Sequence, residues 1–393
     1  MRPLGRRRFL QLGASASGAG IGVSAFPFTA AAAAGAAPDA DDRAVRMSGD
    51  GVPLTPVQYS RLLTRLCDER GIAPDSYSIG GVVEELEQQF ARLLGKERAV
   101  FMPTGTLANH MAVRALANGP SRVLVQEDSH FYLDEGDCAQ TLSNLTLMPL
   151  APGQATFSAA DVQQLLDQTK TGRVSSRVSV IAIETPVRRK QGEQFDPAEL
   201  AKVIALAKRE GIRLHLDGAR LFLQAGYTRE SVAQAAKPFD TVYVSLYKYF
   251  NAASGAILAG PRELLDPMFH ARRMFGGGMP NVWPFAAVAL HYLPGFDERF
   301  TQAVKRSEDL IAALSRHDTF TVTRIPKGTN LFRVKLNGDA AAFRKRLAAR
   351  DILLPAPSGD SFTIGVNETW NRMSAADLTS AFLEAAARPS SPA

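Results

Sequence analysis

Apolar residues along the chain follow two periods, which predict strands and helices in alternation. Residues 178–183 form a nearly continuous apolar run, typical of a strand buried on both faces. Asp196, followed by proline, predicts the start of a helix, with Glu199 completing a capping box. Apolar residues then recur at helical spacing as far as Gly211, and residues 212–216 alternate as a second strand. Strand, helix and strand within about 40 residues predict a parallel crossover unit.

The same alternation recurs before and after this unit. It predicts further strands at residues 99–102, 122–125, 241–245 and 256–259. Beyond about residue 296 the pattern changes to a long amphipathic helix and then to shorter elements, at residues 320–323, 331–334, 341–349 and 362–365. The sequence therefore predicts an α/β fold, with a mostly parallel sheet flanked by helices and a smaller C-terminal α+β domain.

Composition is ordinary for a soluble globular protein. The 393 residues are 46% hydrophobic and 21% charged, which excludes a disordered, collagen-like or coiled-coil chain. Two cysteines are too few for a disulfide framework or a four-cysteine zinc site. The net charge of +6 does not indicate nucleic-acid binding, because the first 36 residues hold four arginines and no acid, and the remainder carries only +2. We therefore expect neither nucleic acid nor a metal ion as a ligand.

The first residues are typical of an export signal. Arg6 and Arg7 are followed, after one further position, by Phe9 and Leu10. A weakly apolar stretch rich in alanine, glycine and serine comes next, with a small-x-small cleavage site at residues 34–36. This pattern resembles a twin-arginine signal. The alternative is a disordered, alanine-rich tail.

The export signal sets the expected location and the first domain limit. Residues 1–37 would be recognised by the twin-arginine translocase, and the mature protein would be periplasmic or secreted. No later run of 18 apolar residues occurs, so we expect no membrane association once the signal is removed. The rest of the chain divides into a predicted N-terminal arm, a large domain and a small domain, at residues 38–85, 86–295 and 296–388.

Three predicted strand ends carry polar residues, and ligands of α/β sheets bind at the carboxyl ends of strands. The first end holds Thr104, Gly105 and Thr106, just before a predicted helix. Backbone N–H groups and the helix dipole at such a place hold an anion such as phosphate. Plain helix capping explains the same residues.

The other two strand ends carry an acid and a lysine. Asp217 follows an apolar strand and must be paired, either with a protonated ring nitrogen, with Arg220 or with a metal. Lys248 lies among three aromatic residues, and an apolar setting depresses the pKa of an amine and favours a Schiff base. An isolated lysine is otherwise a solvated surface group. An anion site, an acid and a buried lysine together describe a site for pyridoxal 5′-phosphate.

In the order and spacing of its motifs, the chain resembles the threonine aldolase / aromatic amino acid β-eliminating lyase family of fold-type-I pyridoxal-phosphate enzymes. The similarity runs from about residue 75 to residue 293 and weakens toward the C-terminus. The matching stretches are Leu86-Glu87, Gly95-Lys96-Glu97, residues 101–109, His130, Glu135-Gly136, residues 215–220, Lys248 and residues 276–279. The resemblance implies that the large domain binds the cofactor and that the protein is a homodimer or homotetramer.

The resemblance also implies roles for individual residues. The cofactor phosphate would be bound by Thr104, Gly105 and Thr106. Asp217 would pair with the ring nitrogen, Lys248 would hold the cofactor covalently, and Arg220 would approach the ring hydroxyl or the substrate carboxylate. His130 would stack on the ring and act as a base near the β-hydroxyl, although a lone histidine is more often structural. The residues expected near the substrate are Glu135, Glu184, Arg220 and Tyr77, the last from the neighbouring subunit.

Two departures concern the grip on the substrate carboxylate. The family commonly has an arginine after its Gly-Gly-Gly-Met and another at the start of the last strand. Here Pro280 and residues 361–364 stand at these places, without an arginine. Loss of a bidentate arginine removes affinity and orientation for a carboxylate. Arg188, Arg189 or Arg272 would have to compensate.

The resemblance implies a carbon–carbon lyase of the threonine aldolase type, which cleaves a β-hydroxy-α-amino acid to glycine and an aldehyde. Two alternatives stay open because the substrate grip is altered. One is a β-eliminating or carbon–sulfur lyase that acts on another amino acid. The other is a non-catalytic periplasmic protein that binds pyridoxal phosphate or an amino acid.

Overall fold

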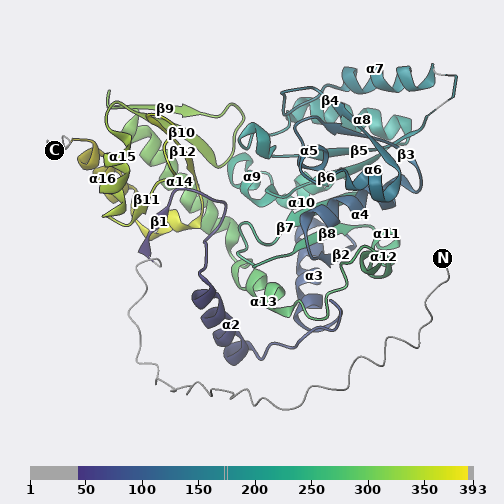
Figure 1. Cartoon of the computed structure of the whole chain (residues 1–393), viewed down its shortest axis with the longest axis horizontal. Coiled ribbons are helices and arrows are strands. Elements are labelled where there is room, and N and C mark those ends of the chain that lie inside the picture. The colour runs from purple at the N-terminus through teal and green to yellow at the C-terminus, as the bar shows by residue number, and fades with distance from the viewer. Residues whose placement is uncertain (1–42, 172, 175, 388–393) are drawn as a thin grey trace, which may run out of the picture. The chain divides into compact units, whose positions relative to one another are not determined.

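Seven strands form the central sheet of the chain, whose computed structural model describes residues 43–171, 173–174 and 176–387 (Figure 1). In chain order these strands are β2 (Arg98–Met102), β3 (Ser121–Gln126), β4 (Leu145–Leu150), β5 (Val178–Glu184), β6 (Arg213–Asp217), β7 (Thr241–Ser245) and β8 (Ala256–Gly260). Across the sheet their order is β2-β8-β7-β6-β5-β3-β4. β8 runs antiparallel to both neighbours, and the other adjacent pairs are parallel. The predicted α/β fold with a mostly parallel sheet is confirmed.

Helices cover both faces of the sheet, because each strand presents alternate side chains to opposite sides. One face shares a hydrophobic core with α3 (Gly81–Leu94), α7 (Ala159–Lys170), α8 (Pro197–Glu210), α9 (Leu221–Thr228), α10 (Val232–Ala236), α13 (Trp283–Tyr292) and α14 (Phe296–Leu314). The other face shares its cores with α4 (Gly105–Ala117), α5 (His130–Leu133), α6 (Cys138–Ser143), α11 (Arg262–Leu265) and α12 (Met268–Met274). In β2, Phe101 points to the first core, and Val100 and Met102 to the second. Burial on both faces explains the continuous apolar runs of the sequence.

The strands β5 and β6, with α8 between them, form the parallel crossover unit that the sequence predicts. Asp196 caps α8 by accepting hydrogen bonds from the backbone N–H groups of Ala198 at 2.9 Å and Glu199 at 3.0 Å. Gly211 ends this helix with a left-handed φ of 66°. The predicted capping box is wrong, because the Glu199 carboxylate accepts instead from the backbone N–H of Ala159 at 3.2 Å. Glu199 thus joins the starts of two helices.

The sheet has two features that the sequence did not predict. β4 lies at the sheet edge and contains Pro149, whose missing backbone donor is tolerated there and conceals the strand in the sequence. β8 is antiparallel because residues 246–255, which join it to β7, contain no helix and are too short for a crossover.

A smaller antiparallel sheet lies in the C-terminal part of the chain. Its strands β9 (Phe320–Arg324), β10 (Leu331–Leu336) and β12 (Ser361–Gly365) are arranged in the order β12-β10-β9. They share a core with α15 (Ala340–Ala348) and α16 (Ala375–Ala387), in which Phe343 packs edge-on against Phe382. The elements of the predicted small domain are present, and the domain boundaries stay a prediction.

The N-terminal segment is held by the C-terminal part of the chain. β1 (Val45–Arg46) pairs in parallel with β11 (Ile352–Leu353). The backbone N–H of Arg46 donates to Thr369 Oγ1 at 2.9 Å, and the Asn367 amide donates to the carbonyls of Arg46 and Ser48. These bonds fix the residues that follow β1, and the chain then continues into α2 (Pro56–Arg70).

The described residues also form two short 3₁₀ helices, η2 (Arg188–Lys190) and η3 (Glu368–Arg372). Within the part of the chain that the structure describes, no helix combines the length and the apolar character needed to cross a bilayer. The predicted export signal falls outside the described residues.

Candidate active site

Polar residues that follow β2, β5, β6 and β7 meet around one cavity of about 220 Å³. All three strand ends that the sequence singled out contribute to it. The cavity is lined by Thr104, Gly105, Thr106, His130, Glu184, Arg188, Asp217, Ala219, Arg220, Tyr243, Tyr247, Lys248 and Ser254. The residues meet because β5, β6 and β7 are parallel neighbours, whose carboxyl ends share one edge of the sheet.

The predicted anion site lies where β2 runs into α4. Thr104 caps this helix by accepting a hydrogen bond from the backbone N–H of Leu107 at 3.2 Å. A Cβ on Gly105 would lie 2.1 Å from the hydroxyl oxygen of Tyr243, so only glycine fits at this position. The first N–H groups of a helix have no partner within the helix. The cap satisfies one of them and leaves others for a phosphate, so capping and anion binding are compatible here.

Asp217 is the last residue of β6, and only 4% of its surface is exposed. Its Oδ1 accepts from the backbone N–H of Ala219 at 3.1 Å, and its Oδ2 accepts from the side-chain amide of Asn109 at 2.7 Å. The ion pair with Arg220 is not formed, because the Arg220 guanidinium binds Asp50 at 2.8 Å. A buried carboxylate at the cavity wall, held by two neutral donors, suits a protonated ring nitrogen.

Asn109, in α4, connects buried groups behind the cavity. Its amide nitrogen also donates to Glu135 Oε1 at 2.8 Å, and its oxygen lies 2.9 Å from His215 Nε2. His215 Nδ1 lies 2.9 Å from the hydroxyl of Thr241. Burial lowers the pKa of His215 to about 4, so a neutral ring that donates to Asn109 and accepts from Thr241 fits this pattern. The network fixes the orientation of Asp217 and Glu135.

The same amide argues against a metal at this point. Ligand atoms of His130, Glu135 and Asp217 lie within 4.8 Å of one another, a spacing that would suit a cation. Asn109, however, donates its N–H groups to both carboxylates. These hydrogens occupy lone pairs that a cation would need. The group is a hydrogen-bond network rather than a set of metal ligands.

His130 stands at the start of α5, and one of its ring nitrogens is bound. Nδ1 lies 2.9 Å from Glu135 Oε1. This hydrogen bond raises the pKa of His130, while burial raises the pKa of Glu135 to about 7. With an Nδ1–H group directed at Glu135, the Nε2 atom is left as the proton acceptor on the cavity side.

Glu184, the last residue of β5, ties two walls of the cavity together. Its carboxylate accepts hydrogen bonds from the backbone N–H groups of His130 at 2.7 Å and Arg188 at 2.9 Å. Burial, and then the nearby charge of Asp217, raise the pKa of Glu184. This side chain therefore positions the backbone on both sides of the cavity.

Lys248 follows β7 and lines the cavity. Burial, and then the positive charge of Arg220, lower the pKa of its amine to about 8. The Nζ atom lies 5.6 Å from the centre of the Tyr247 ring and forms no hydrogen bond or ion pair with another described residue. The N-terminal segment packs on its backbone, because a Cβ on Gly51 would lie 2.2 Å from the Lys248 carbonyl oxygen. Lys248 is half-buried, and its amine is a candidate nucleophile rather than a fully solvated surface group.

Known proteins share both the sequence pattern and the fold of this chain. Residues 73–337 match the family of beta-eliminating lyases. The chain belongs to the beta-eliminating lyase family. Over 275 residues it is 25% identical to low-specificity L-threonine aldolase 1 of Arabidopsis thaliana. This match covers 68% of this chain and 77% of that protein. Other curated relatives are matched over little more than half of their own length, 58% in one case and 55% in another.

Solved structures place the chain among the fold-type-I pyridoxal-phosphate enzymes. A Listeria monocytogenes protein assigned as an L-allo-threonine aldolase is 26% identical, with a TM-score of 0.72 over 88% of this chain and 97% of that one. Serine palmitoyltransferase of S. paucimobilis, solved with bound pyridoxal phosphate, shares the fold at 16% identity and a TM-score of 0.60, over 87% of each chain. The predicted cofactor, pyridoxal 5′-phosphate, is confirmed by family and fold.

The three arginines that the sequence offers as replacement ligands for a substrate carboxylate lie in different places. Arg188 lines the cavity. Arg189 is bound to Asp134 at 2.5 Å, away from the cavity lining. Arg272 is buried and donates to the backbone carbonyls of Phe101 and Tyr77. Only Arg188 is therefore placed to meet a ligand in the cavity.

Tyr77 does not line the cavity of its own subunit. Its backbone N–H donates to the Pro280 carbonyl at 2.8 Å, and the Arg273 guanidinium lies 4.6 Å from its ring centre. Tyr77 and Ser78 both have positive φ angles, of 52° and 62°, and Asp75 holds them by accepting from the Ser78 N–H at 2.8 Å. The ring is 38% exposed, and its role in a neighbouring subunit's site stays a prediction.

Three residues that shape the site had no predicted role. Asn109 was part of a matching stretch, and its spacing of about one helical turn from Gly105 could have indicated a place in the same wall. Tyr243 alternates with Ser245 along β7, which puts both side chains on one face of the strand. Asp50 reaches Arg220 only through long-range pairing of β1, for which the sequence contains no local pattern.

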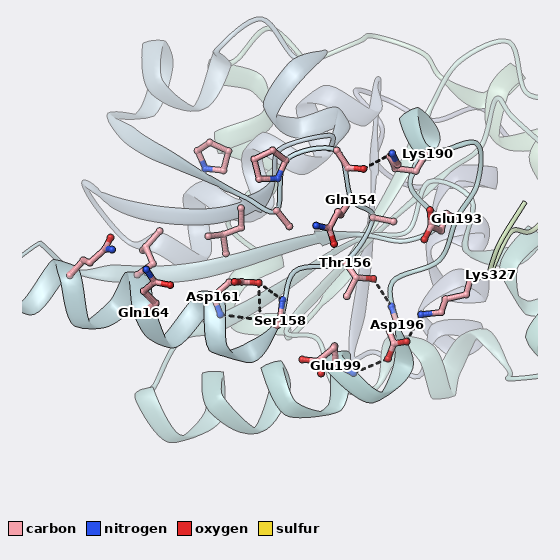
Figure 2. Close-up of a pocket in the computed structure, with 18 residues that line it drawn as sticks. Gln154, Thr156, Ser158, Asp161, Gln164, Lys190, Glu193, Asp196, Glu199 and Lys327 are labelled. Atoms are coloured by element: carbon pink, nitrogen blue, oxygen red, sulfur yellow. Dashed lines mark hydrogen bonds and ion pairs between the residues drawn. The ribbon is translucent and has the colours of Figure 1, made fainter.

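A second cavity, of about 850 Å³, lies between the loop after β4 and the start of α8, outside the set of predicted site residues (Figure 2). Many of its charged side chains are bound by the protein itself. Asp161 binds Ser158, Lys190 donates to the Gly153 carbonyl, and Lys327 pairs with Asp196. These contacts fix the loops around the second cavity and give no indication of a ligand.

Proposed function

We propose that this protein is a pyridoxal-phosphate-dependent lyase that cleaves the Cα–Cβ bond of a β-hydroxy-α-amino acid, releasing glycine and an aldehyde. The observation that carries the proposal is the His130–Glu135 pair in the same cavity wall as Asp217 and Lys248. A histidine whose second nitrogen is free supplies the base that retro-aldol cleavage needs. Similarity to threonine aldolases supports the reaction type.

The residues of the cavity fit the cofactor. Lys248 would hold its aldehyde carbon covalently, the start of α4 its phosphate, and Asp217 its ring nitrogen. The fit rests on the missing Cβ of Gly105 and on the unpaired amine of Lys248. When bound, pyridoxal phosphate takes up the electron pair that the broken Cα–Cβ bond leaves on Cα.

The side chains of this chain would do the remaining work. His130 Nε2 would accept the β-hydroxyl proton, and the carbonyl of the aldehyde forms as the Cα–Cβ bond breaks. Glu135 holds the His130 ring by its Nδ1 side and stabilises the imidazolium that results. Glu184 keeps the backbone of His130 in place while the proton is transferred.

A product assay tests the proposal. Purified protein with bound pyridoxal phosphate is incubated with threonine, with serine and with cysteine, and the products are identified. Equal amounts of glycine and acetaldehyde from threonine are expected. Pyruvate from serine or cysteine without acetaldehyde from threonine would favour β-elimination instead. Release of neither product over a panel of β-hydroxy amino acids would favour a binding protein.

The second candidate function, β-elimination, has one observation in its favour. The residues around the cofactor site are in place, while the segment at the start of β12 carries no arginine. The described residues therefore fit the cofactor but do not select one particular amino acid as the substrate. Retro-aldol cleavage remains the better supported reaction, because His130 Nε2 is available as a proton acceptor and the similar curated proteins include threonine aldolases.

A further inference from the structure

Three cationic side chains line the cofactor cavity, and two of them are already committed. Lys248 is the amine that would hold the cofactor. Arg220 donates to Asp50 Oδ2 through Nε at 2.9 Å and through Nη2 at 2.8 Å. Only 16% of each of these two side chains is exposed, so water screens the pair weakly. Asp50 therefore occupies one edge of the Arg220 guanidinium, and a substrate carboxylate at the other edge would meet a charge that Asp50 already neutralises.

Arg188 is the third cation, and it is available. Its backbone N–H donates to Glu184 Oε1 at 2.9 Å, which fixes the start of η2 at the cavity wall. Its guanidinium makes no hydrogen bond or ion pair with another residue in the described ranges. The next residue, Arg189, differs in this respect, because Asp134 binds its guanidinium through two hydrogen bonds.

We propose that Arg188 binds the α-carboxylate of the substrate. This assignment rests on the proposed function, because that function makes the substrate an α-amino acid. A guanidinium offers two parallel N–H groups that match the two oxygens of a carboxylate, and the charge makes these hydrogen bonds strong. The grip comes from η2, directly after β5, and takes the place of the arginine that residues 361–364 lack.

The arrangement has a consequence for orientation. Glu184 positions both Arg188 and His130 through their backbone N–H groups, so one buried carboxylate sets the spacing between the carboxylate grip and the base. A substrate held by Arg188 through its carboxylate and by Lys248 through the cofactor would present its third substituent in a fixed direction. The carboxylate contact would therefore set orientation as well as affinity.

A pair of ligands that differ only in the carboxylate tests the assignment. Glycine and methylamine are titrated into the protein loaded with pyridoxal phosphate, and each dissociation constant is read from the change in the visible absorption band. For Arg188→Gln, the dissociation constant for glycine should rise about 10- to 100-fold, because a charge-assisted bidentate contact is lost. The value for methylamine should stay within about twofold, since methylamine makes no such contact.

Arg189→Gln is the matched control, because it removes the same charge at the next residue, where Asp134 already holds the guanidinium. It should leave both dissociation constants within about twofold. Arg188→Lys keeps the charge without the fork and should give an intermediate value for glycine. It also keeps the test decisive if Arg188→Gln loses the cofactor.

Three results would overturn the assignment. Unchanged glycine binding in Arg188→Gln is one, and an equal loss for glycine and methylamine is another. The third is that Asp50→Asn tightens glycine binding while Arg188→Gln has no effect, which would make Arg220 the grip. The readout needs no turnover, so a protein that shows the predicted difference yet releases no aldehyde would refute the proposed lyase and leave the role of Arg188 standing.

Discussion

At the residue scale, burial and hydrogen bonding prepare each group of the site for a different task. The Lys248 amine has no hydrogen-bond or ion-pair partner among the described residues. Its pKa is lowered to about 8, which keeps part of the amine neutral near physiological pH. His130 has a partner that raises its pKa, which favours proton uptake. The same cavity therefore holds a candidate nucleophile and a candidate base whose pKa values are shifted in opposite directions.

Replacement of Lys248 by alanine should abolish covalent attachment of the cofactor. The purified protein is expected to be yellow, and the variant should lose that visible band because no other described amine lines the cavity. Absorption spectra after gel filtration measure the outcome. Lys208→Ala, on the surface of α8, serves as the control and should keep the band. A variant that stays yellow would contradict the assignment.

The rate of cofactor attachment should depend on pH through this lysine. Only the neutral amine attacks the aldehyde, and the pKa of Lys248 is lowered to about 8. Below that pH the attachment rate to cofactor-free protein should rise about tenfold per pH unit, and above it the rate should level off. Stopped-flow absorbance measures the rate. A rise that continues unchanged to pH 10 would show that the amine keeps its ordinary pKa.

Substitution of His130 by phenylalanine should separate binding from cleavage. The aromatic ring can still stack on the cofactor, so the visible band should remain, while kcat for aldehyde release should fall by about 100- to 10,000-fold, the range for loss of a general base. His317→Phe, at an exposed histidine outside the cavity, is the control. Unchanged turnover in His130→Phe would remove the proposed role of His130.

At the element scale, the junction of β2 and α4 illustrates how a local sequence can specify a binding site. The strand end, the capping threonine and the glycine are all adjacent in sequence, so this part of the site was predictable. The reason why glycine is required was not, because it depends on Tyr243 of β7, which is distant in the chain. Local patterns predicted the residues of the anion site but not their packing.

Gly105→Ala should weaken cofactor binding by about tenfold or more. The added Cβ would lie 2.1 Å from the Tyr243 hydroxyl oxygen, so the start of α4 has to move away from the phosphate position. Equilibrium dialysis of pyridoxal phosphate measures the change, and circular dichroism checks that the helices persist. Ala115→Ser, further along α4 and outside the cavity lining, is the control. Cofactor affinity equal to that of the unaltered protein would show that the junction is not the phosphate site.

Much of the fold was predictable for a physical reason. Strands buried on both faces leave continuous apolar runs, and the helices between them carry caps such as Asp196 and Gly211. The elements β5, α8 and β6 could therefore be predicted from local sequence. β4 was missed because an edge strand is allowed a proline. The direction of β8 was not predicted, because orientation depends on the connection rather than on the strand itself.

The site was predictable where residues follow strands, and unpredictable where pairing is long-range. Asp217 and Lys248 could be placed together because parallel strand ends share one edge. The pairing of Arg220 with Asp50 could not, and it removed one of the ion pairs that the sequence left open for Asp217. Charge neutralisation at a site depends on every segment that reaches it, which no single motif records.

At the scale of the whole molecule, export and assembly remain proposals. We propose that residues 1–37 direct the protein through the twin-arginine route and that the mature protein is periplasmic or secreted. Changing Arg6 and Arg7 together to lysine should retain the protein in the cytoplasm, because this route requires the arginine pair. Cell fractionation measures the distribution, with Arg2→Lys as the control. Normal secretion of the double variant would contradict the proposal.

We also propose that the protein is a homodimer or homotetramer in which Tyr77 acts in the neighbouring site. If so, mixing inactive Tyr77→Ala and Lys248→Ala subunits should restore some turnover, because a mixed pair contains one site with both residues intact. Subunits are mixed in denaturant and refolded, and aldehyde release is measured. Sedimentation confirms the assembly state. No recovery from a mixture that does form hybrids would place Tyr77 outside the neighbouring site.

The pairing of β1 with the C-terminal part of the chain has a consequence for biosynthesis. Arg46 is bound by Thr369, 323 residues further along the chain, and Asp50 reaches Arg220 from this same anchored segment. The contact between Arg46 and Thr369 cannot form until residue 369 has been synthesised, which happens near the end of translation. Capture of the vitamin-derived cofactor by a finished pocket is therefore a late event, after almost the entire chain has left the ribosome.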